Sequence, residues 1–347
     1  MKSSGKMIVK ILITLFLALF IGALLILMIG ESPLQAYGAL LKGAFGTKLG
    51  LGTTIAGFTP LILTSIAFAV AAQAGAFNVG VEGEVILGGL TAAYIGVNWG
   101  FLSVPMLIIA CFLGAMIVAG LWALIPAVLK SYFNVSEICV TILMNSVAVY
   151  IASYFVSGPM SAGTANPQSL PVLVHLSKIM KPSAANVGIY IAIFVAILII
   201  FLLYKTKFGF EIRSVGLNPK NADYIGMNSR HTFIKAMVLS GVLGGIAGCI
   251  EVLGVHGYYL DGFATGLGSN GMLAALIVKG NPIFAPITAF FLAVLKSGSM
   301  AMQQSTSVPK GIVDTITAVF IIVATMDIVI DFVKKHKQKT INSRGEK

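Results

Sequence analysis

The chain contains 347 residues, of which 57% are hydrophobic and only 10% charged, and its formal net charge is +11. Soluble domains carry roughly 25% charged residues, so this composition excludes an ordinary soluble enzyme and predicts one membrane-embedded domain over residues 1–347. The lysines flank apolar segments and form no basic domain, so no nucleic-acid partner is expected.

The apolar segments predict an all-α polytopic membrane protein with about ten transmembrane helices, since a crossing takes about 20 residues. In chain order the segments are 8–29, 54–73, 81–97, 101–129, 137–157, 186–204, 231–254, 268–280, 282–302 and 311–331. The first has the position of a signal peptide, but it is longer than a typical apolar region and lacks a small-residue cleavage site. We therefore expect it to be retained.

Basic residues predict the orientation, because cytoplasmic connections are enriched in lysine and arginine. Most of the 23 basic residues fall in one set of places: the N-terminus, Lys130, residues 205–230, Lys279 and the basic tail 332–347. Both termini are therefore predicted to be cytoplasmic. Two connections are predicted to lie on the outer side of the membrane. They are residues 30–53, expected to form an interfacial helix and a loop, and the proline-containing residues 158–185.

Residues 77–89 interrupt apolar sequence with one amide, Asn78, and two carboxylates, Glu82 and Glu84, among four glycines. In lipid, broken backbone is tolerated only inside protein or beside water, and intramembrane charges are commonly functional. Asn78 and Glu82 are four residues apart and are expected on one side, lining a transport pathway or holding a helix junction. Glu84 is expected to point elsewhere and to reach water.

A second polar stripe, formed by Glu137, Thr141 and Asn145, occupies one helix face by its spacing. Hydrogen bonding between helices explains such a stripe better than substrate contact does. Small residues four apart predict close helix packing; the pairs are Gly241 with Gly245 and Gly244 with Gly248.

Glu251 and His256 approach the outer end of segment 231–254. Each can reach interfacial water there, which is the simpler interpretation, or can line a pathway. Three aromatic residues lie near residues 77–89 or near Glu251 and His256: Phe77, Tyr259 and Phe263. Such side chains can stack on a nucleobase, but in membrane proteins they more often pack against neighbouring side chains.

Ten segments divide into two sets of five, and the breaks near residues 74–84 and 255–271 occupy corresponding places in the two sets. Because five is odd, such halves would have inverted topology, a common transporter plan. The sequence similarity between the halves is too weak to establish the repeat.

The connection 205–230 carries the signals of a short helix. Asn218 is a good N-cap, Pro219 suits the first helical position, and Gly226 suits the stop, so a helix is predicted from Pro219 to about Ile225. It is either a docking element for a cytoplasmic partner or an ordinary capped loop. The sequence has no phosphate-loop motif, no Cys/His cluster with metal-ligand spacing and no catalytic constellation, so neither an enzyme nor a cofactor of its own is expected.

Three blocks together carry a family resemblance. Residues 213–226, Arg-Ser-Val-Gly-Leu-Asn-Pro-Lys-Asn-Ala-Asp-Tyr-Ile-Gly, resemble the coupling loop of permease subunits of bacterial ABC importers in the branched-chain amino acid/simple-sugar class. Residues 77–84 and 134–145 are similar to blocks of its nucleoside branch, which works with BMP lipoproteins. Glu84 replaces an expected glutamine and Ser136 an expected asparagine, which leaves the class intact but weakens the substrate assignment.

The resemblance implies a pore-forming permease subunit with a fold like the cobalamin-importer permeases, in the bacterial plasma membrane. It implies a second permease, homologous or identical, a separate cytoplasmic ABC ATPase that uses ATP, and an extracytoplasmic lipoprotein that delivers nucleoside. The expected coupling residues are Arg213, Gly216, Asn218, Pro219, Ala222 and Gly226. The expected pathway residues are Phe77, Asn78, Glu82, Asn145 and Glu251.

Two other transport functions stay open from the sequence. One is a simple-sugar permease of the same class. The other is an ion-coupled secondary carrier in which Glu82 and Glu251 are the ion sites. The capped helix in the connection 205–230 and the lack of an ion-site cluster favour the ATP-driven importer, and a membrane enzyme is a distant third.

Overall fold

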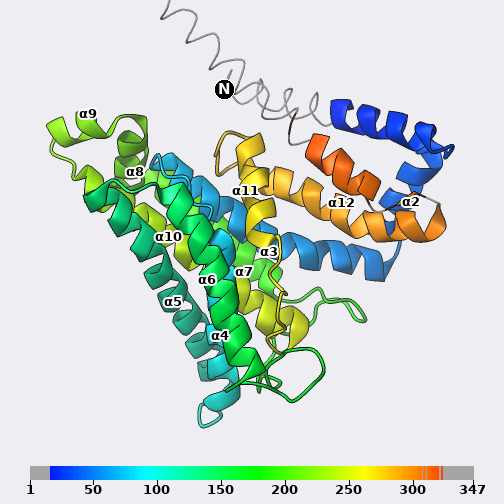
Figure 1. Cartoon of the computed structure of the whole chain (residues 1–347), viewed down its shortest axis with the longest axis horizontal. Coiled ribbons are helices and arrows are strands. Elements are labelled where there is room, and N and C mark those ends of the chain that lie inside the picture. Colours follow the sequence, from blue (N-terminus) through cyan, green and yellow to red (C-terminus); the bar gives the residue numbers. More distant parts are fainter. Residues whose placement is uncertain (1–15, 307, 310, 320–321, 323–347) are drawn as a thin grey trace, which may run out of the picture.

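The computed structural model describes residues 16–306, 308–309, 311–319 and 322, and all regular elements longer than an isolated bridge in this part of the chain are helices (Figure 1). A helix over Phe16–Met28 comes first. The following helices are α2 (Pro33–Phe45), α3 (Lys48–Gln73), α4 (Val81–Asn98), α5 (Val104–Phe133), α6 (Glu137–Ser157), α7 (Gly188–Lys205), α8 (Lys207–Leu217), α9 (Pro219–Tyr224), α10 (Ser229–Ile250), the π-helical turn η1 (Glu251–His256), α11 (Leu267–Ile277) and α12 (Ala285–Ser305).

Six of these helices are long and apolar enough to cross a membrane: α3, α5, α6, α7, α10 continued by η1, and α12. A seventh crossing is formed if Phe16–Met28 and α2, which meet at 119°, count as one broken span. The prediction of an all-helical, multi-pass membrane protein is therefore confirmed.

The number ten stays a prediction. The expected spans 8–29 and 311–331 lie partly outside the described residues, and the tail 332–347 lies wholly outside them. Span 81–97 forms α4, whose first turn contains Glu82 and Glu84, and this helix is not among those apolar enough to cross alone. The segment expected at 268–280 forms only the 11-residue α11.

The start of α3 differs from its prediction. Residues 30–53 contain the expected helix, α2, but no loop as long as predicted, because α3 begins at Lys48 instead of residue 54. The Thr47 hydroxyl caps this earlier start by accepting a hydrogen bond from the Gly50 amide over 3.0 Å. Pro60 lies inside α3, where it removes one backbone hydrogen bond.

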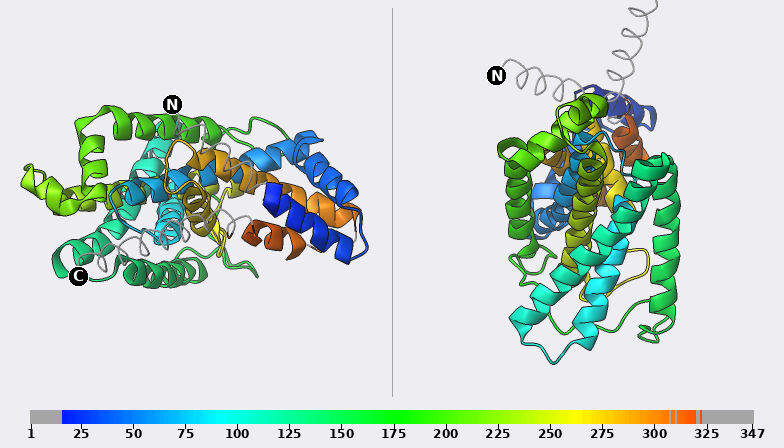
Figure 2. Two further views of the ribbon diagram at one scale, coloured as in Figure 1. Left: turned by 90° about the horizontal axis from the view of Figure 1, so that it is seen from above. Right: turned by 90° about the vertical axis from the view of Figure 1, so that its left-hand side faces the viewer.

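Helix α3 lies at the centre of the molecule and contacts α2, α12, α11, α10 and α7. Figures 1 and 2 show α2 and α12 at one end of the long axis and the α8–α9 connection at the other, with α3 passing between them. In its most apolar stretch 78% of α3 is buried, as in α10, against 17% of α6. Thus α3 and α10 are internal, while α6 exposes an apolar surface suited to lipid.

Helix α10 packs against α5 and α4 through small residues, as predicted. A Cβ added at Gly241, Gly245 or Gly248 would overlap a backbone carbonyl oxygen of Ala119, Ala115 or Val85, respectively. We call these three contacts the glycine seam. No larger side chain fits there without separating the helices, so the backbones of α4, α5 and α10 are in direct contact.

The connection between α6 and α7 runs along the segment that follows α10. The Leu176 amide donates to the Leu253 carbonyl, the Val172 amide to that of Gly257, and the Ser169 amide to that of Tyr259, each over 2.9 Å. These bonds satisfy backbone groups around the second break, which is a requirement for irregular backbone at membrane depth.

Candidate functional site

The first break lies between Gln73, where α3 ends, and Val81, where α4 begins, close to its predicted position. Asn78 within it is fully buried. Its side-chain nitrogen donates to Glu84 Oε1 over 2.8 Å and to Ser240 Oγ over 2.9 Å, while its oxygen accepts from the Gly80 amide. Asn78 thus ties the break to α10.

Glu84 is also buried, with 1% of its surface exposed. The expectation that it reaches water was wrong, because α4 begins at Val81 and its first turn directs Glu84 toward Asn78 and α10. Its second oxygen, Oε2, has no hydrogen-bond partner among the described residues. A buried carboxyl with one hydrogen bond is costly to ionise.

Glu82 lies on a different side of α4 from the Asn78 contacts, so the prediction that both share one side was also wrong. Its carboxylate accepts hydrogen bonds from the Gly266 amide over 3.0 Å, the Ser269 amide over 3.3 Å and the Ser269 hydroxyl over 2.7 Å. These donors belong to the start of α11, where free amides favour an anion. Glu82 therefore joins the first break to the second.

Asn145 on α6 holds the backbone of the first break from the other side. Its amide donates to the Val79 carbonyl over 3.0 Å and accepts from the Gly83 amide over 2.9 Å. In the same stripe, Glu137 pairs with Lys130 at 3.0 Å. Phe77 packs edge-to-face on Phe68, with ring centroids 5.0 Å apart. Packing between helices, rather than contact with a substrate, explains these contacts of Asn145, Glu137 and Phe77.

The second break borders a cavity of about 270 Å³ between α3, η1 and α12, whose mostly apolar walls include Glu251, His256 and Lys296. Glu251, 7% exposed, lines it and faces His256, with 3.7 Å between Oε2 and Nε2. Lys296 on α12 lines the same cavity and attracts the Glu251 carboxylate electrostatically. Phe263 completes the wall and packs edge-to-face on His256 and on Tyr259, which is itself buried.

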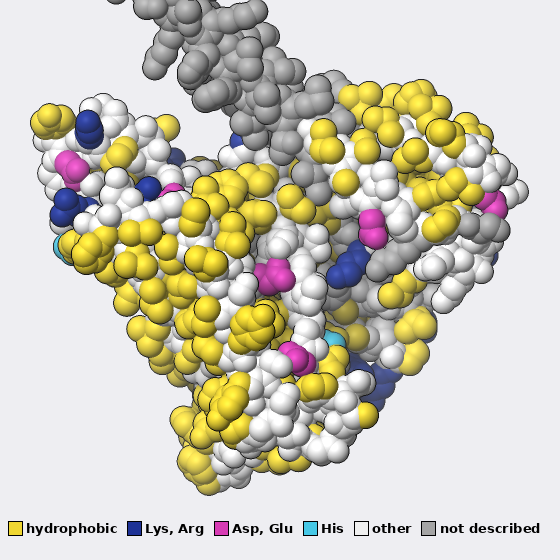
Figure 3. All heavy atoms as spheres, in the orientation of Figure 1, with side chains coloured by type: hydrophobic (Ala, Val, Ile, Leu, Met, Phe, Trp, Pro, Cys, Tyr) yellow, Lys and Arg dark blue, Asp and Glu magenta, His cyan; other side chains and the backbone are white. Residues whose placement is uncertain are grey.

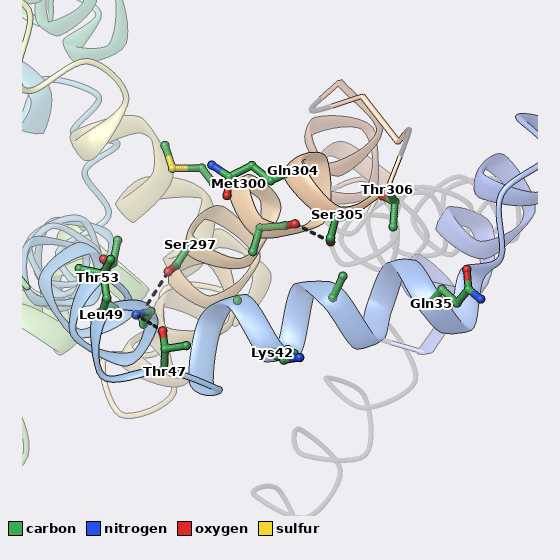
Figure 4. A pocket seen from close by; sticks show the side chains of 14 residues that line it. Gln35, Lys42, Thr47, Leu49, Thr53, Ser297, Met300, Gln304, Ser305 and Thr306 are labelled. Atoms are coloured by element: carbon green, nitrogen blue, oxygen red, sulfur yellow. Dashed lines mark hydrogen bonds between the residues drawn. The ribbon is translucent and has the colours of Figure 1, made fainter.

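A larger groove of about 740 Å³ adjoins this cavity, and α2, the start of α3 and the second half of α12 form it (Figure 4). Its polar lining consists of hydroxyl, amide and amine side chains, among them Gln35, Lys42, Thr47, Gln304 and Ser305. Thr53, Ser297 and Met300 line both hollows, so the groove and the cavity adjoin at these three residues.

The central part of one face of the molecule carries charged side chains. Figure 3 shows acidic, basic and histidine side chains exposed in the hollow between two regions of hydrophobic surface. Charged side chains that face lipid are costly. This face is therefore suited to water or to another protein.

The predicted helix in the connection 205–230 is confirmed as α9. Asn218 accepts a hydrogen bond from the Asn221 amide over 3.1 Å, Pro219 opens the helix, and Gly226 has a φ of +83°. Asp223 accepts from the amide and the hydroxyl of Ser229, each over 2.9 Å. These bonds lower the pKa of Asp223 below its usual range, so it stays ionised near neutral pH.

The α8–α9 connection touches the end of α3. A Cβ added at Gly216 would overlap the Gln73 carbonyl oxygen. The Gln73 side chain in turn donates to the Gly280 carbonyl just beyond α11, over 3.0 Å. Gln73 therefore links α8 to the first break and to the connection between α11 and α12. Of the other coupling candidates, Ala222 is buried and Arg213 lies over the Tyr204 ring, 5.0 Å from its centroid.

Comparison with known proteins decides the family. Residues 50–329 match the family described as branched-chain amino acid transport system / permease component. The chain belongs to this permease family. No solved structure matches it.

Several members of this permease family are similar over most of the chain. The guanosine ABC transporter permease protein NupP of Bacillus subtilis is 33% identical over 95% of this chain and 97% of its own length. The glucose ABC transporter permease protein TsgB13 of Haloferax volcanii is 31% identical over 89% and 85%. The nucleoside ABC transporter permease protein NupB of Lactococcus lactis is 27% identical over the full length of both.

The two organisms with nucleoside permeases each have a second one that is also similar to this chain. NupQ of Bacillus subtilis is 26% identical over 70% of the chain, and NupC of Lactococcus lactis is 28% identical over 69%.

The sequence did not predict two features of the site. Lys296 was placed inside an apolar span, and a lysine at that depth was itself the available signal. Gln73 gave no signal, because its role depends on the close approach of Gly216, a contact between segments far apart in sequence.

Proposed function

We propose that the chain is the pore-forming permease subunit of an ATP-driven importer of nucleosides. The observation that carries the proposal is its alignment over nearly the whole length with permeases named for guanosine and for nucleosides. Permease subunits of this kind have no ATPase site of their own, so this chain is not an enzyme.

The proposed mechanism couples a separate cytoplasmic ABC ATPase to the breaks in this chain. The ATPase would bind α9 and move α8. Gly216 is in contact with Gln73, so the movement would reach the first break directly and, through Gly280, the end of α11, the helix that follows the second break. The pathway residues Asn78, Glu82, Asn145 and Glu251 would then change partners as the pore opens to alternate sides.

The proposal includes partners and a location. A second permease would complete the pore, as the paired relatives NupP with NupQ and NupB with NupC suggest. An extracytoplasmic lipoprotein would deliver the substrate. The complex would lie in the bacterial plasma membrane, with both termini cytoplasmic and with about ten helices in a cobalamin-importer-like fold.

A glucose permease relative makes a simple sugar the second candidate substrate. Uptake of labelled inosine and of glucose by cells with and without this permease distinguishes the two. Inosine uptake that depends on the permease is expected, and uptake of glucose alone would replace nucleoside by sugar.

The energy source tests the importer against the ion-coupled carrier. We expect uptake to stop when ATP is depleted and to persist with a protonophore while ATP is maintained. Uptake driven by a pH or sodium gradient without ATP would contradict the importer.

A further inference from the structure

The permease itself contains a substrate-binding site, we infer, in the cavity lined by Glu251, His256, Phe263 and Lys296. Its ligand is a neutral planar ring that carries an N–H beside a C=O group on one edge, as in 6-oxopurine and uracil nucleosides. The inference rests on the proposed function and adds a site within the pore to it.

The first argument is the free hydrogen-bonding capacity of the cavity. Glu251 is buried, and its recorded partners among the described residues are His256, at 3.7 Å, and the more distant charge of Lys296. A carboxylate at membrane depth with acceptor sites directed into a cavity favours a donor from a ligand.

The second argument is the pairing of opposite groups. Glu251 is an acceptor, whereas Lys296 offers three donors and no acceptor. Among the described residues Glu251 lies 3.7 Å from His256, whereas no salt bridge joins it to Lys296, and both Glu251 and Lys296 line the cavity. An N–H beside a C=O presents one donor and one acceptor to these two groups.

The third argument is the shape of the wall. Phe263 lines the cavity and is held by edge-to-face packing on Tyr259 and His256, with centroids 5.0 and 5.9 Å away. A held aromatic ring favours stacking of a planar aromatic ligand. The volume of about 270 Å³ suits the base, while the ribose can extend into the adjoining groove.

The fourth argument is access. The groove and the cavity share Thr53, Ser297 and Met300, so only these side chains need to move for a ligand in the groove to reach the cavity that Glu251 lines. Figure 4 shows Thr53, Ser297 and Met300 from α3 and α12 at the inner end of this groove.

The test measures how fast a cysteine introduced at position 297 reacts with a thiol reagent. It uses the permease reconstituted with its ATPase and without the lipoprotein. The variant is Ser297→Cys with Cys139→Ser, since the two other cysteines are buried. Inosine is expected to slow labelling by a water-soluble maleimide at least fivefold. Ribose, and 1-methylinosine, which lacks the ring N–H, are expected to leave the rate unchanged.

A second variant tests the role of Glu251. In Glu251→Gln, the inosine concentration for half-maximal protection is expected to rise about tenfold, because a charge-assisted hydrogen bond becomes a neutral one. The matched control is Glu137→Gln, whose carboxylate pairs with Lys130 outside the cavity and which should leave protection unchanged.

Three outcomes would overturn the inference: no protection by inosine, equal protection by ribose, or equal loss of protection in both glutamine variants. Uptake by the unmodified complex is measured in parallel. ATP-dependent inosine uptake without protection at Ser297→Cys would refute the site and leave the importer standing, whereas absence of any nucleoside uptake would refute the proposed function itself.

Discussion

Glu84 and Glu82, two residues apart, have opposite environments. Glu84 is buried against Asn78 and α10, whereas Glu82 is half-buried and caps the start of α11. The sequence predicted polar residues at a break but assigned the inward and outward roles the wrong way round. Asn78 precedes the first residue of α4, Val81, so the four-residue spacing that places side chains on one helix face does not apply to Asn78 and Glu82.

We expect Glu84→Gln to be mild and Glu84→Leu to be damaging. The glutamine oxygen still accepts the Asn78 hydrogen bond, and no buried carboxyl remains. Leucine removes the acceptor, at about 1–3 kcal/mol, and its branch meets Gly244, whose added Cβ would lie 2.7 Å from Glu84 Cβ. Thermal unfolding of the purified complex measures the difference, and equal loss in both variants would contradict it.

We expect Glu82→Leu to impair transport more than Ser269→Ala does. Leucine leaves two amides and one hydroxyl at the start of α11 without their shared acceptor, whereas alanine removes only one of three hydrogen bonds. An unsatisfied donor costs about 1–3 kcal/mol when buried, and less here because Glu82 is partly exposed. Initial uptake rates at equal membrane abundance provide the measurement; an unaffected Glu82→Leu would remove Glu82 from the machinery.

At the scale of the element, α9 was predictable and the cavity was not. Asn218, Pro219 and Gly226 act on their own neighbours, so the cap, the start and the stop of α9 follow from adjacent residues. The proximity of Glu251 and Lys296 depends on how α12 packs beside η1, which no local signal encodes. Likewise, Thr47 and burial extend α3 into glycine-rich sequence whose composition favoured a loop.

The contact between α8 and α3 predicts a defect in coupling. In Gly216→Val the new side chain would overlap the Gln73 carbonyl oxygen, so we expect α8 to move away from Gln73. Overpacking of this kind costs about 1–3 kcal/mol. ATP hydrolysis by the complex should then persist while uptake falls at least tenfold. Gly38→Val on α2 is the control, since a Cβ there meets no atom within 4 Å. Normal uptake by Gly216→Val would show that the contact transmits nothing.

At the scale of the whole molecule, the orientation is testable with two exposed lysines. We expect Lys220→Cys in α9 to react with an impermeant maleimide only from the cytoplasmic side, and Lys178→Cys in the α6–α7 connection only from outside. The reason is the excess of basic residues around α9. Both variants carry Cys139→Ser, and labelling of both positions from one side would contradict the predicted topology.

The glycine seam has a consequence for how the molecule moves. Helices slide past one another by repacking the side chains between them, and α4, α5 and α10 have backbone contacts where such side chains would lie. We therefore expect these three helices to move as one block. Helix α3 contacts α10 in this block and α12 beyond it, and Pro60 interrupts its hydrogen bonding between its two ends. We expect the conformational change to bend α3 near Pro60, so that α2 and α12 swing as a unit against a frame that keeps its shape throughout the cycle.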